Sequence, residues 1–343
     1  MSWLLARQRP DIMLYTALTV LLILLALQAV SYGPLESNIA SLIAALTQNE
    51  PDAVQAQLAA TFWHLRLPRV ALALLAGAAL ALAGITMQAL FRNPLAEPGL
   101  TGSASGAALA AAAVLVLGLF EAQPFALPVA AFLGALCSTA LIVLLPAAYN
   151  GSMAGLLLLG IAINAIAAAG LGFLSFLADD FALRSLTFWQ FGSLGKASWP
   201  EILWAFAFAL PAMVWLLLQA RQMNSLLLGE ADALCLGVPV KRFKITALIA
   251  CSLCVGAAVA CAGIIAFVGL VVPHLLRLLL GPDHRRLLPA SVLVAPALLM
   301  AADSIARSVV SPAELPIGIL TSLIGGPFFV YLLLRPRRNS AHV

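Results

Sequence analysis

The chain has 343 residues, of which 63% are hydrophobic and only 9% are charged, and its mean hydropathy is +1.05. Soluble domains carry about 25% charged residues, so this composition excludes a water-soluble enzyme, a disordered tail and a nucleic-acid-binding module. The net charge of +4 says little about a partner, because Lys and Arg in membrane proteins mark cytoplasmic loops. The chain is therefore expected to lie in a lipid bilayer and to bind no nucleic acid.

The first apolar segment runs from Ile12 to Leu35 without a charge and follows Arg7 and Arg9. A secretory signal has an apolar region of only about 7–15 residues, so this longer segment is expected to remain as a membrane span.

Further apolar segments follow, and a helix that crosses a bilayer needs about 20 such residues. Pro146, Asn150 and Gly151 mark a turn that divides the long segment between Glu121 and Asp179. We predict an all-α integral membrane protein with ten transmembrane helices. Its single domain (1–343) is expected to have spans near 12–34, 70–91, 102–120, 125–147, 154–177, 202–220, 245–264, 265–280, 287–308 and 315–334.

The uncharged segment 245–276 lies between Lys244 and Arg277, and basic residues crowd both of its ends. If both ends face the cytoplasm, the segment crosses an even number of times. At about 1.5 Å per residue it forms roughly 48 Å of helix, less than the roughly 60 Å that two crossings need. One arm must therefore be short or broken, and Gly263, Gly269 and Pro273 mark the expected break.

The distribution of basic residues predicts the orientation. With ten spans and both termini in the cytoplasm, most of the 18 Lys and Arg residues face the cytoplasm, as the positive-inside rule requires. The exceptions, all expected at or near the outer face, are Arg66, Arg69, Arg184, Lys196 and Arg307.

An internal repeat links residue n to residue n + 179. Residues 77–85 read GAALALAGI and residues 256–264 read GAAVACAGI, and Pro94 then aligns with Pro273. The two copies are five crossings apart and so have opposite orientations. Inverted repeats of this kind build transport pathways, although small residues also recur at ordinary helix contacts.

Three of the exceptional arginines admit two interpretations. Arg66 and Arg69 lie in the sequence RLPR before the second span, and Arg307 lies near the outer end of the ninth. They could present positive charge to an acidic partner outside the cell. Alternatively they bind lipid phosphates, and Arg307 pairs with Asp303 one helical turn earlier.

The outer segment 179–199 is amphipathic and rich in aromatic residues. Its Phe188 and Trp189 could belong to an interfacial aromatic belt, or to a gate where Arg184 and Lys196 attract an anionic solute. Asn164, within the fifth span, could line a path or form an interhelical hydrogen bond.

The longest polar loop, 221–244, is expected in the cytoplasm. Within it, Glu230 and Ala233 followed by Gly237 and Val238 are typical of a short helix that ends at a glycine. Such a helix either lies on the lipid surface or docks a partner.

The sequence shows no site for nucleotide binding or catalysis, so another protein must supply the energy for transport. Residues 192–197 resemble a phosphate loop, but Ala197 replaces the Ser or Thr that would bind magnesium. The four histidines are scattered, which predicts no metal site and no catalytic group. The chain is expected to bind no cofactor and to be no enzyme.

Several long motifs resemble the FecCD/BtuC-type permease family, the ten-span membrane subunits of type II ABC importers for vitamin B12, ferric siderophores and haem. The similarity covers nearly the whole chain, in order. The motifs are RLPRVALALLAGAALALAGITMQALFRNPLAEPGLTGSASGA (66–107), GEADALCLGV (229–238), GIIAFVGLVVPHLLR (263–277) and ADSIARSVVSPAELPIGILTSLIGGPFF (302–329).

This resemblance implies a permease domain in a bacterial inner membrane, with a second permease copy, two cytoplasmic ATPase subunits that use ATP and magnesium, and a periplasmic solute-binding protein. It implies that Arg66, Arg69 and Arg307 dock the binding protein and that Asn164, Arg184, Phe188 and Trp189 belong to the pathway or its gate. Coupling to the ATPase is implied for Gly229, Glu230, Ala233, Leu236, Gly237 and Val238.

The run LRSLTFWQFGSLG (183–195) is more similar to haem permeases than to the other members, so we expect haem as the substrate, with a ferric siderophore or cobalamin as alternatives. The rival from another class is an ion-coupled secondary transporter, which also uses inverted repeats. It would need an intramembrane ionisable residue, for which Asp303 is the clear candidate. A membrane-embedded enzyme is disfavoured, because no nucleophile, base or set of metal ligands converges.

Overall fold

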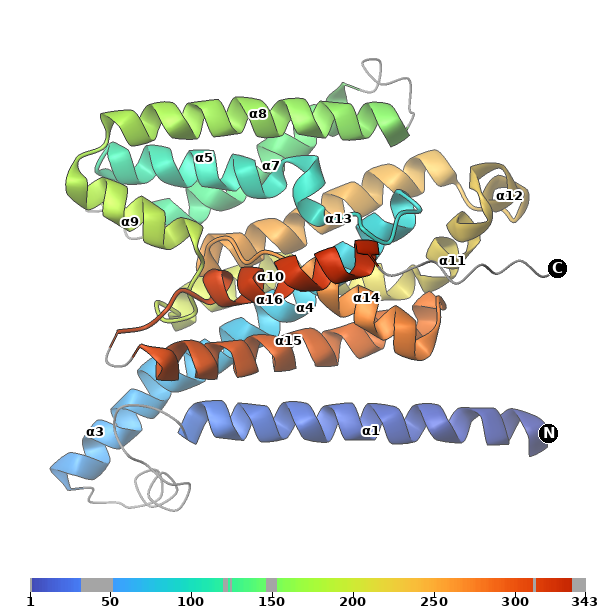
Figure 1. Ribbon diagram of the computed structural model, residues 1–343, viewed down its shortest axis with the longest axis horizontal. Helices are drawn as coiled ribbons and strands as arrows, with labels where there is room; N and C mark the ends of the chain where they lie inside the picture. Colours follow the sequence, from blue (N-terminus) through green and yellow to red (C-terminus); the bar gives the residue numbers. More distant parts are fainter. Residues whose placement is uncertain are drawn as a thin grey trace.

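The computed structural model describes residues 2–31, 52–119, 123, 125–145, 153–310 and 313–334. Within these ranges every regular element is a helix, and most helices run along the long axis of the molecule (Figure 1). The predicted turn at Pro146, Asn150 and Gly151 lies outside the described residues.

The elements follow in chain order. They are α1 (Ser2–Ser31), α3 (Ala53–Thr61), the π-helical turn η1 (Phe62–Arg66), α4 (Leu67–Leu90), the 3-10 turn η2 (Pro98–Thr101), α5 (Ser103–Val116), α7 (Ala126–Leu144), α8 (Met153–Leu177), α9 (Asp180–Gln190), α10 (Trp199–Leu218), α11 (Ala220–Leu228), α12 (Glu230–Cys235), α13 (Val240–Ala262), α14 (Val268–Leu280), α15 (His284–Val309) and α16 (Ile317–Leu334).

Ten apolar helices account for the fold. Seven are long and apolar enough to cross a membrane, with the continuous helix Ala53–Leu90 counted once, and three shorter ones cover Ser103–Val116, Val268–Leu280 and Ile317–Tyr331. The predicted class, an all-α membrane protein with ten spanning helices, is confirmed for the described part of the chain.

The span expected at 102–120 is shorter in the structure. Pro98–Thr101 form a 3-10 turn, Gly102 has a φ of 74°, and α5 then covers 14 residues before Gly118 turns the chain with a φ of 68°. At about 1.5 Å per residue, α5 is roughly 21 Å long. Glycines at positive φ fix both of its ends, because side chains rarely adopt that conformation.

The segment 245–276 forms two arms, of which the second is short. α13 ends at Ala262, Gly263 has a φ of 68°, and α14 starts after Phe267, which is at a φ of 67°. Gly269 and Pro273, expected at the break, lie inside α14 instead. Non-helical backbone at the break is tolerated because protein surrounds it and supplies partners. The N–H of Phe267, for example, donates to Glu97 Oε1 (3.3 Å).

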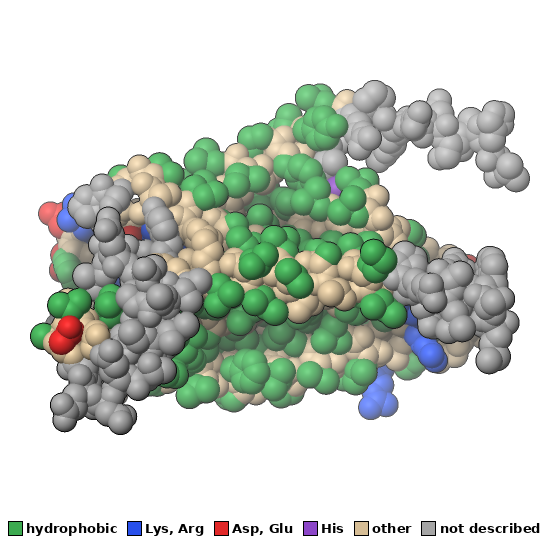
Figure 2. Space-filling model, turned by 90° about the horizontal axis from the view of Figure 1, so that it is seen from below, with side chains coloured by type: hydrophobic (Ala, Val, Ile, Leu, Met, Phe, Trp, Pro, Cys, Tyr) green, Lys and Arg blue, Asp and Glu red, His purple; other side chains and the backbone are tan. Residues whose placement is uncertain are grey.

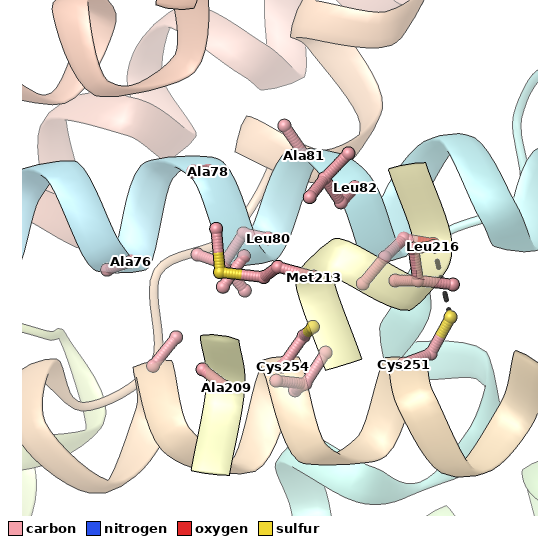
Figure 3. Close-up of a cluster of buried hydrophobic side chains, with 14 of the residues drawn as sticks. Ala76, Ala78, Leu80, Ala81, Leu82, Ala209, Met213, Leu216, Cys251 and Cys254 are labelled. Atoms are coloured by element: carbon pink, nitrogen blue, oxygen red, sulfur yellow. Dashed lines mark hydrogen bonds between the residues drawn. The ribbon is translucent and has the colours of Figure 1, made fainter. Parts of the chain in front are cut away.

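The two copies of the repeat pack against each other. α4 is almost wholly buried and contacts α10, α13, α14 and α15. It ends beside the start of α13, so the two helices are antiparallel, and the Cys251 thiol lies 3.8 Å from the carbonyl oxygen of Ala83 (Figure 3). Alanine and glycine allow this close approach. The two copies differ in structure downstream of the repeat, because Pro94 lies in a turn whereas the aligned Pro273 lies in a helix.

One flank of the molecule is covered mainly by hydrophobic side chains, and the charged side chains that can be seen there lie toward its two ends (Figure 2). This distribution suits a body set in hydrocarbon with polar caps on either side.

A helix that the sequence reading missed precedes the second span. α3 has a capping box, in which the Asp52 side chain accepts from the N–H of Gln55 and the Gln55 side chain accepts from the N–H of Asp52. This D-x-x-Q pattern is a recognised helix start, so the sequence carried the signal.

Candidate functional sites at the two ends

The polar clusters lie at opposite ends of the helix bundle. We call the end that carries Arg69, Asp303 and Glu314 the Arg69 end, and the end that carries α11 and α12 the α12 end. α1 begins and α16 ends toward the α12 end (Figure 1).

Arg69, in the first turn of α4, binds two carboxylates. Its Nε lies 3.0 Å from Asp303 Oδ1 on α15, and its Nη1 and Nη2 lie 2.9 and 2.8 Å from Glu314 Oε1 and Oε2. All three nitrogen positions of the guanidinium therefore face carboxylate oxygens, in the bidentate geometry that makes arginine pairs directional.

The other two candidate arginines join the same cluster. Arg307 Nε lies 3.1 Å from Asp303 Oδ2, one helical turn away. Arg66 Nη1 donates to the carbonyl oxygens of Val30 (2.8 Å) and Ser31 (3.2 Å) at the end of α1. The structure thus brings the three predicted docking arginines together, but directs them toward their own chain.

The structure tests the pairing of Arg307 with Asp303 that their helical spacing suggests. This pair is present. Asp303 is 5% exposed and lies between two guanidinium groups. Its charge is therefore balanced within the chain, as buried charges must be.

Aromatic residues of α9 line a cavity beside this cluster. The Asp179 carboxylate caps α9 by accepting from the N–H of Ala182 (2.7 Å). The helix lines a cavity of about 310 Å³ with Arg184, Phe188 and Trp189, and Lys196 and Glu314 complete its polar wall. Two cationic groups beside flat aromatic surfaces can hold an anionic, partly apolar solute.

The wall of this cavity is tied to two spanning helices. The N–H groups of Ile317 and Gly318, which begin α16, donate to the carbonyl oxygens of Gly192 (3.0 Å) and Phe191 (2.9 Å). The N–H of Ser193 donates to the last residue of α13, Ala262 (2.7 Å). These bonds satisfy helix-end groups that would otherwise lack partners, so α9, α13 and α16 meet at one point.

Asn164 links three elements rather than standing alone in a channel. Ser105 Oγ on α5 donates to Asn164 Oδ1 (2.7 Å), and Asn164 Nδ2 donates to the carbonyl oxygen of Gly99 (3.1 Å). The interhelical hydrogen bond, one of its two interpretations, is thus present.

At the α12 end, the loop 221–244 forms two short helices, α11 and α12. The N–H of Gly237 donates to Leu234 and that of Val238 to Ala233, the paired bonds of a Schellman motif, with Gly237 at a φ of 82°. Ala233 and Val238 are buried, whereas Leu236 is 61% exposed.

The other two members of the predicted coupling set lie at the start of α12. Gly229 adopts a φ of 128° there. Glu230 Oε2 lies 2.6 Å from Lys244 Nζ, which joins α12 to α13.

α11, which the sequence reading missed, is anchored to α15. Asn224 Nδ2 donates to Asp283 Oδ1 (2.6 Å), and Asn224 Oδ1 accepts from the N–H of His284 (2.9 Å). Burial would raise the pKa of Asp283, but hydrogen bonds from the Arg285 N–H and Asn224, with the charges of Arg285 and Arg286, lower it below its usual range. A charged carboxylate therefore caps α15 and orients α11.

Among the described residues, no group of three or more His, Cys, Asp or Glu side chains could hold a metal ion. Glu314 is a member of the Arg69 end that the sequence reading did not single out, whereas Lys196, expected beside Arg184 at the gate, lines the same cavity as Arg184. No spacing rule points to Glu314, because its partner Arg69 lies 245 residues away.

Comparison with known proteins shows the family. Residues 18–335 match the FecCD transport family. The chain is 44% identical to the hemin transport system permease protein HmuU of Yersinia pestis, over 97% of this chain and 98% of that protein. It is 42% identical to the vitamin B12 import system permease protein BtuC of Vibrio cholerae, over 80% and 82%.

A solved structure agrees. The fold is similar to an inward-facing metal-chelate type ABC transporter, with a TM-score of 0.83, 32% identity and coverage of 93% of this chain and 98% of that one. Together with the ten-helix bundle, these matches identify the chain as a member of the FecCD transport family, a membrane-spanning permease subunit of an importer.

Proposed function

We propose that this permease moves haem from a periplasmic binding protein into the cytoplasm. The observation that carries the substrate is the match to the hemin permease, which extends over 97% of the chain, whereas the vitamin B12 permease matches over 80% at similar identity. Cobalamin remains the second candidate on the strength of that relative, and a ferric siderophore the third.

The cavity at α9 supports the choice of haem. Haem is a flat, apolar macrocycle with two carboxylates. Arg184 and Lys196 can pair with carboxylates, and Phe188 and Trp189 offer flat apolar surfaces. The lining residues include no histidine, so this cavity would hold haem by its edges and faces, without a bond to iron.

The complete importer would contain a second copy of this chain, two cytoplasmic ATPase subunits and the binding protein, in a bacterial inner membrane with both termini cytoplasmic. ATP and magnesium would act in the ATPase subunits, and this chain would hold no cofactor. Its residues do no chemistry on the solute. They stabilise two conformations, each favoured by a different partner.

The two ends of the molecule would then have different partners. Arg66, Arg69 and Arg307 would dock the binding protein, whose acidic residues would complement their charge. Gly229–Val238 would couple to the ATPase through the exposed face of α12. Arg184, Phe188 and Trp189 would form the outer gate, and Asn164 would fix α8 beside the pathway.

Secondary transport fits the charges less well. The carboxylate of Asp303 is neutralised by Arg69 and Arg307 at 3.0 and 3.1 Å, and a coupling ion would have to displace two guanidinium groups. Uptake by the permease alone under an ion gradient, with no ATPase present, would establish that rival instead.

The test is ATP hydrolysis by the complete importer in liposomes. The binding protein of the same transport system should stimulate hydrolysis severalfold more when loaded with haem than when empty or loaded with cobalamin or a ferric siderophore. Equal or greater stimulation by cobalamin or a siderophore would refute haem as the substrate and leave the permease role intact.

A further inference from the structure

Glu314 holds an exposed position on the Arg69 end. It lies in the loop between α15 and α16, and its side chain is 45% exposed, compared with 15% for Arg69 and 5% for Asp303. Both of its carboxylate oxygens accept hydrogen bonds from Arg69, at 2.9 and 2.8 Å. Glu314 therefore covers the side of the guanidinium that faces away from the bundle.

Its position decides which contact a docking protein would meet. Asp303 lies beneath the guanidinium, in the body of α15, and is also paired with Arg307. A carboxylate that binds the Nη1 and Nη2 atoms of Arg69 in the same bidentate geometry would have to take the place of Glu314. Exchange at this point should cost less than at Asp303, because the Glu314 carboxylate is 45% exposed and screened by water, whereas that of Asp303 is 5% exposed.

The same residue touches the gate. Glu314 lines the cavity that holds Arg184 and Phe188. A Cβ atom added at Gly195, in the turn after α9, would lie 2.8 Å from Glu314 Oε2. The turn therefore packs directly on the ion pair, and the hydrogen bonds of Gly192 and Phe191 to the start of α16 continue the connection.

We propose that Glu314 is an intramolecular stand-in for an acidic residue of the docking protein: it occupies Arg69 until a partner carboxylate displaces it. Displacement removes the side-chain tether of the 313–316 loop and leaves backbone bonds such as that from the Leu315 N–H to the Ala306 carbonyl oxygen (3.2 Å), so that docking loosens one wall of the gate. This inference rests on the proposed docking role of Arg69. The partner that it fits is a protein surface with an exposed Asp or Glu.

The test compares the affinity of the full importer, in nanodiscs, for its haem-loaded binding protein. Glu314→Gln keeps the shape of the side chain and removes the competing charge, so binding should tighten by about threefold to tenfold. Asp180→Asn, which removes one exposed charge from the same end without touching Arg69, is the matched control and should leave the affinity within about twofold.

The background variant Arg69→Ala separates the two hypotheses. In that background Glu314→Gln should give no gain, since the competed site is absent. If Arg69→Ala alone leaves the affinity unchanged, the docking role of Arg69 fails. If Arg69→Ala weakens binding but Glu314→Gln does not strengthen it, or if the gain persists without Arg69, the stand-in role alone is overturned.

Discussion

The arginines of the cluster at the Arg69 end have different partners among the described residues. Arg69 and Arg307 bind the carboxylates of Asp303 and Glu314, whereas Arg66 donates to the carbonyl oxygens of Val30 and Ser31. Breaking a buried pair by removing one partner typically costs about 3–5 kcal/mol, so Asp303 is the structural member of the cluster. Glu314 is the exchangeable member, because water already reaches it.

Glu314 gives the cluster a pH dependence. Hydrogen bonds from Arg69 lower the pKa of Glu314 below its ordinary value of 4.5, with burial acting in the opposite direction. A lowered folded-state pKa contributes stability that is fully present above the unfolded pKa and is lost as the pH falls through the folded one. The apparent Tm of the purified permease should therefore exceed that of Glu314→Gln at pH 7, and the difference should shrink below about pH 4.5.

Thermal unfolding in detergent, monitored between pH 3.5 and 7, measures this difference. A gap between parent and Glu314→Gln that stays constant down to pH 3.5 would contradict the assignment of the shift to the ion pair.

The same residues show what sequence reasoning can reach. The pair between Asp303 and Arg307 follows from helical spacing, since residues four apart share a face. The bonds of Arg69 to Asp303 and Glu314 join positions 234 and 245 residues apart. They depend on how α4 packs against α15, which no local pattern encodes. The resemblance to the permease family pointed to Arg66, Arg69 and Arg307 as site residues, but it did not point to Glu314, whose carboxylate covers Arg69.

Among the elements, α4 and α14 approach each other more closely than side chains allow. A Cβ atom added at Gly84 would lie 1.8 Å from the carbonyl oxygen of Gly269. The obstacle is backbone, so it cannot move aside as a flexible side chain would. The α13–α14 break positions α14 at this distance, and the glycine in α4 is what permits it.

Gly84→Ala should therefore destabilise the permease by about 1–3 kcal/mol, because overpacking outweighs the gain in helix propensity of alanine over glycine. Gly172→Ala in α8 is the control, since a Cβ atom there meets no atom within 4 Å. Apparent Tm and monodispersity in detergent measure both variants. A Gly84→Ala protein as stable as Gly172→Ala would show that the helices are further apart than described.

The elements that sequence reading missed have different causes. α3 has a capping box that is visible in the sequence. α11 lies in a stretch that the sequence predicts as a polar loop, because its apolar face is short and its anchor, Asp283, lies in a different segment. Gly269 and Pro273 predict a helix break, yet tertiary contacts keep both inside α14. Helix ends in a packed bundle depend on neighbours that propensity does not include.

At the scale of the whole molecule, we propose that the α12 end faces the cytoplasm and the Arg69 end the periplasm. Both assignments rest on the positive-inside rule. Lys241, Lys244 and Arg277 cluster toward the α12 end, and Arg277 reaches the Gln88 side chain there at 3.0 Å. α13 and α14 together return the chain to the end from which it started. The orientation of the bundle in a membrane therefore decides which partner can meet which end.

Cysteine labelling tests that orientation with a residue the chain already has. Cys235, at the end of α12, is an exposed thiol, so a membrane-impermeant maleimide should modify it in inside-out vesicles and leave it unmodified in right-side-out vesicles, as mass mapping of the labelled peptide would show. Lys196→Cys, made with Cys235→Ser and Cys261→Ser, places an exposed thiol on the opposite end and should react in the reverse pattern. Cys137 is exposed on the apolar surface of α7 and should resist the reagent from both sides, because lipid rather than water would surround it. Modification of Cys235 from outside would show that the topology is the reverse of the proposed one. Arg66, Arg69 and Arg307 would then face the cytoplasm and could not bind a periplasmic partner.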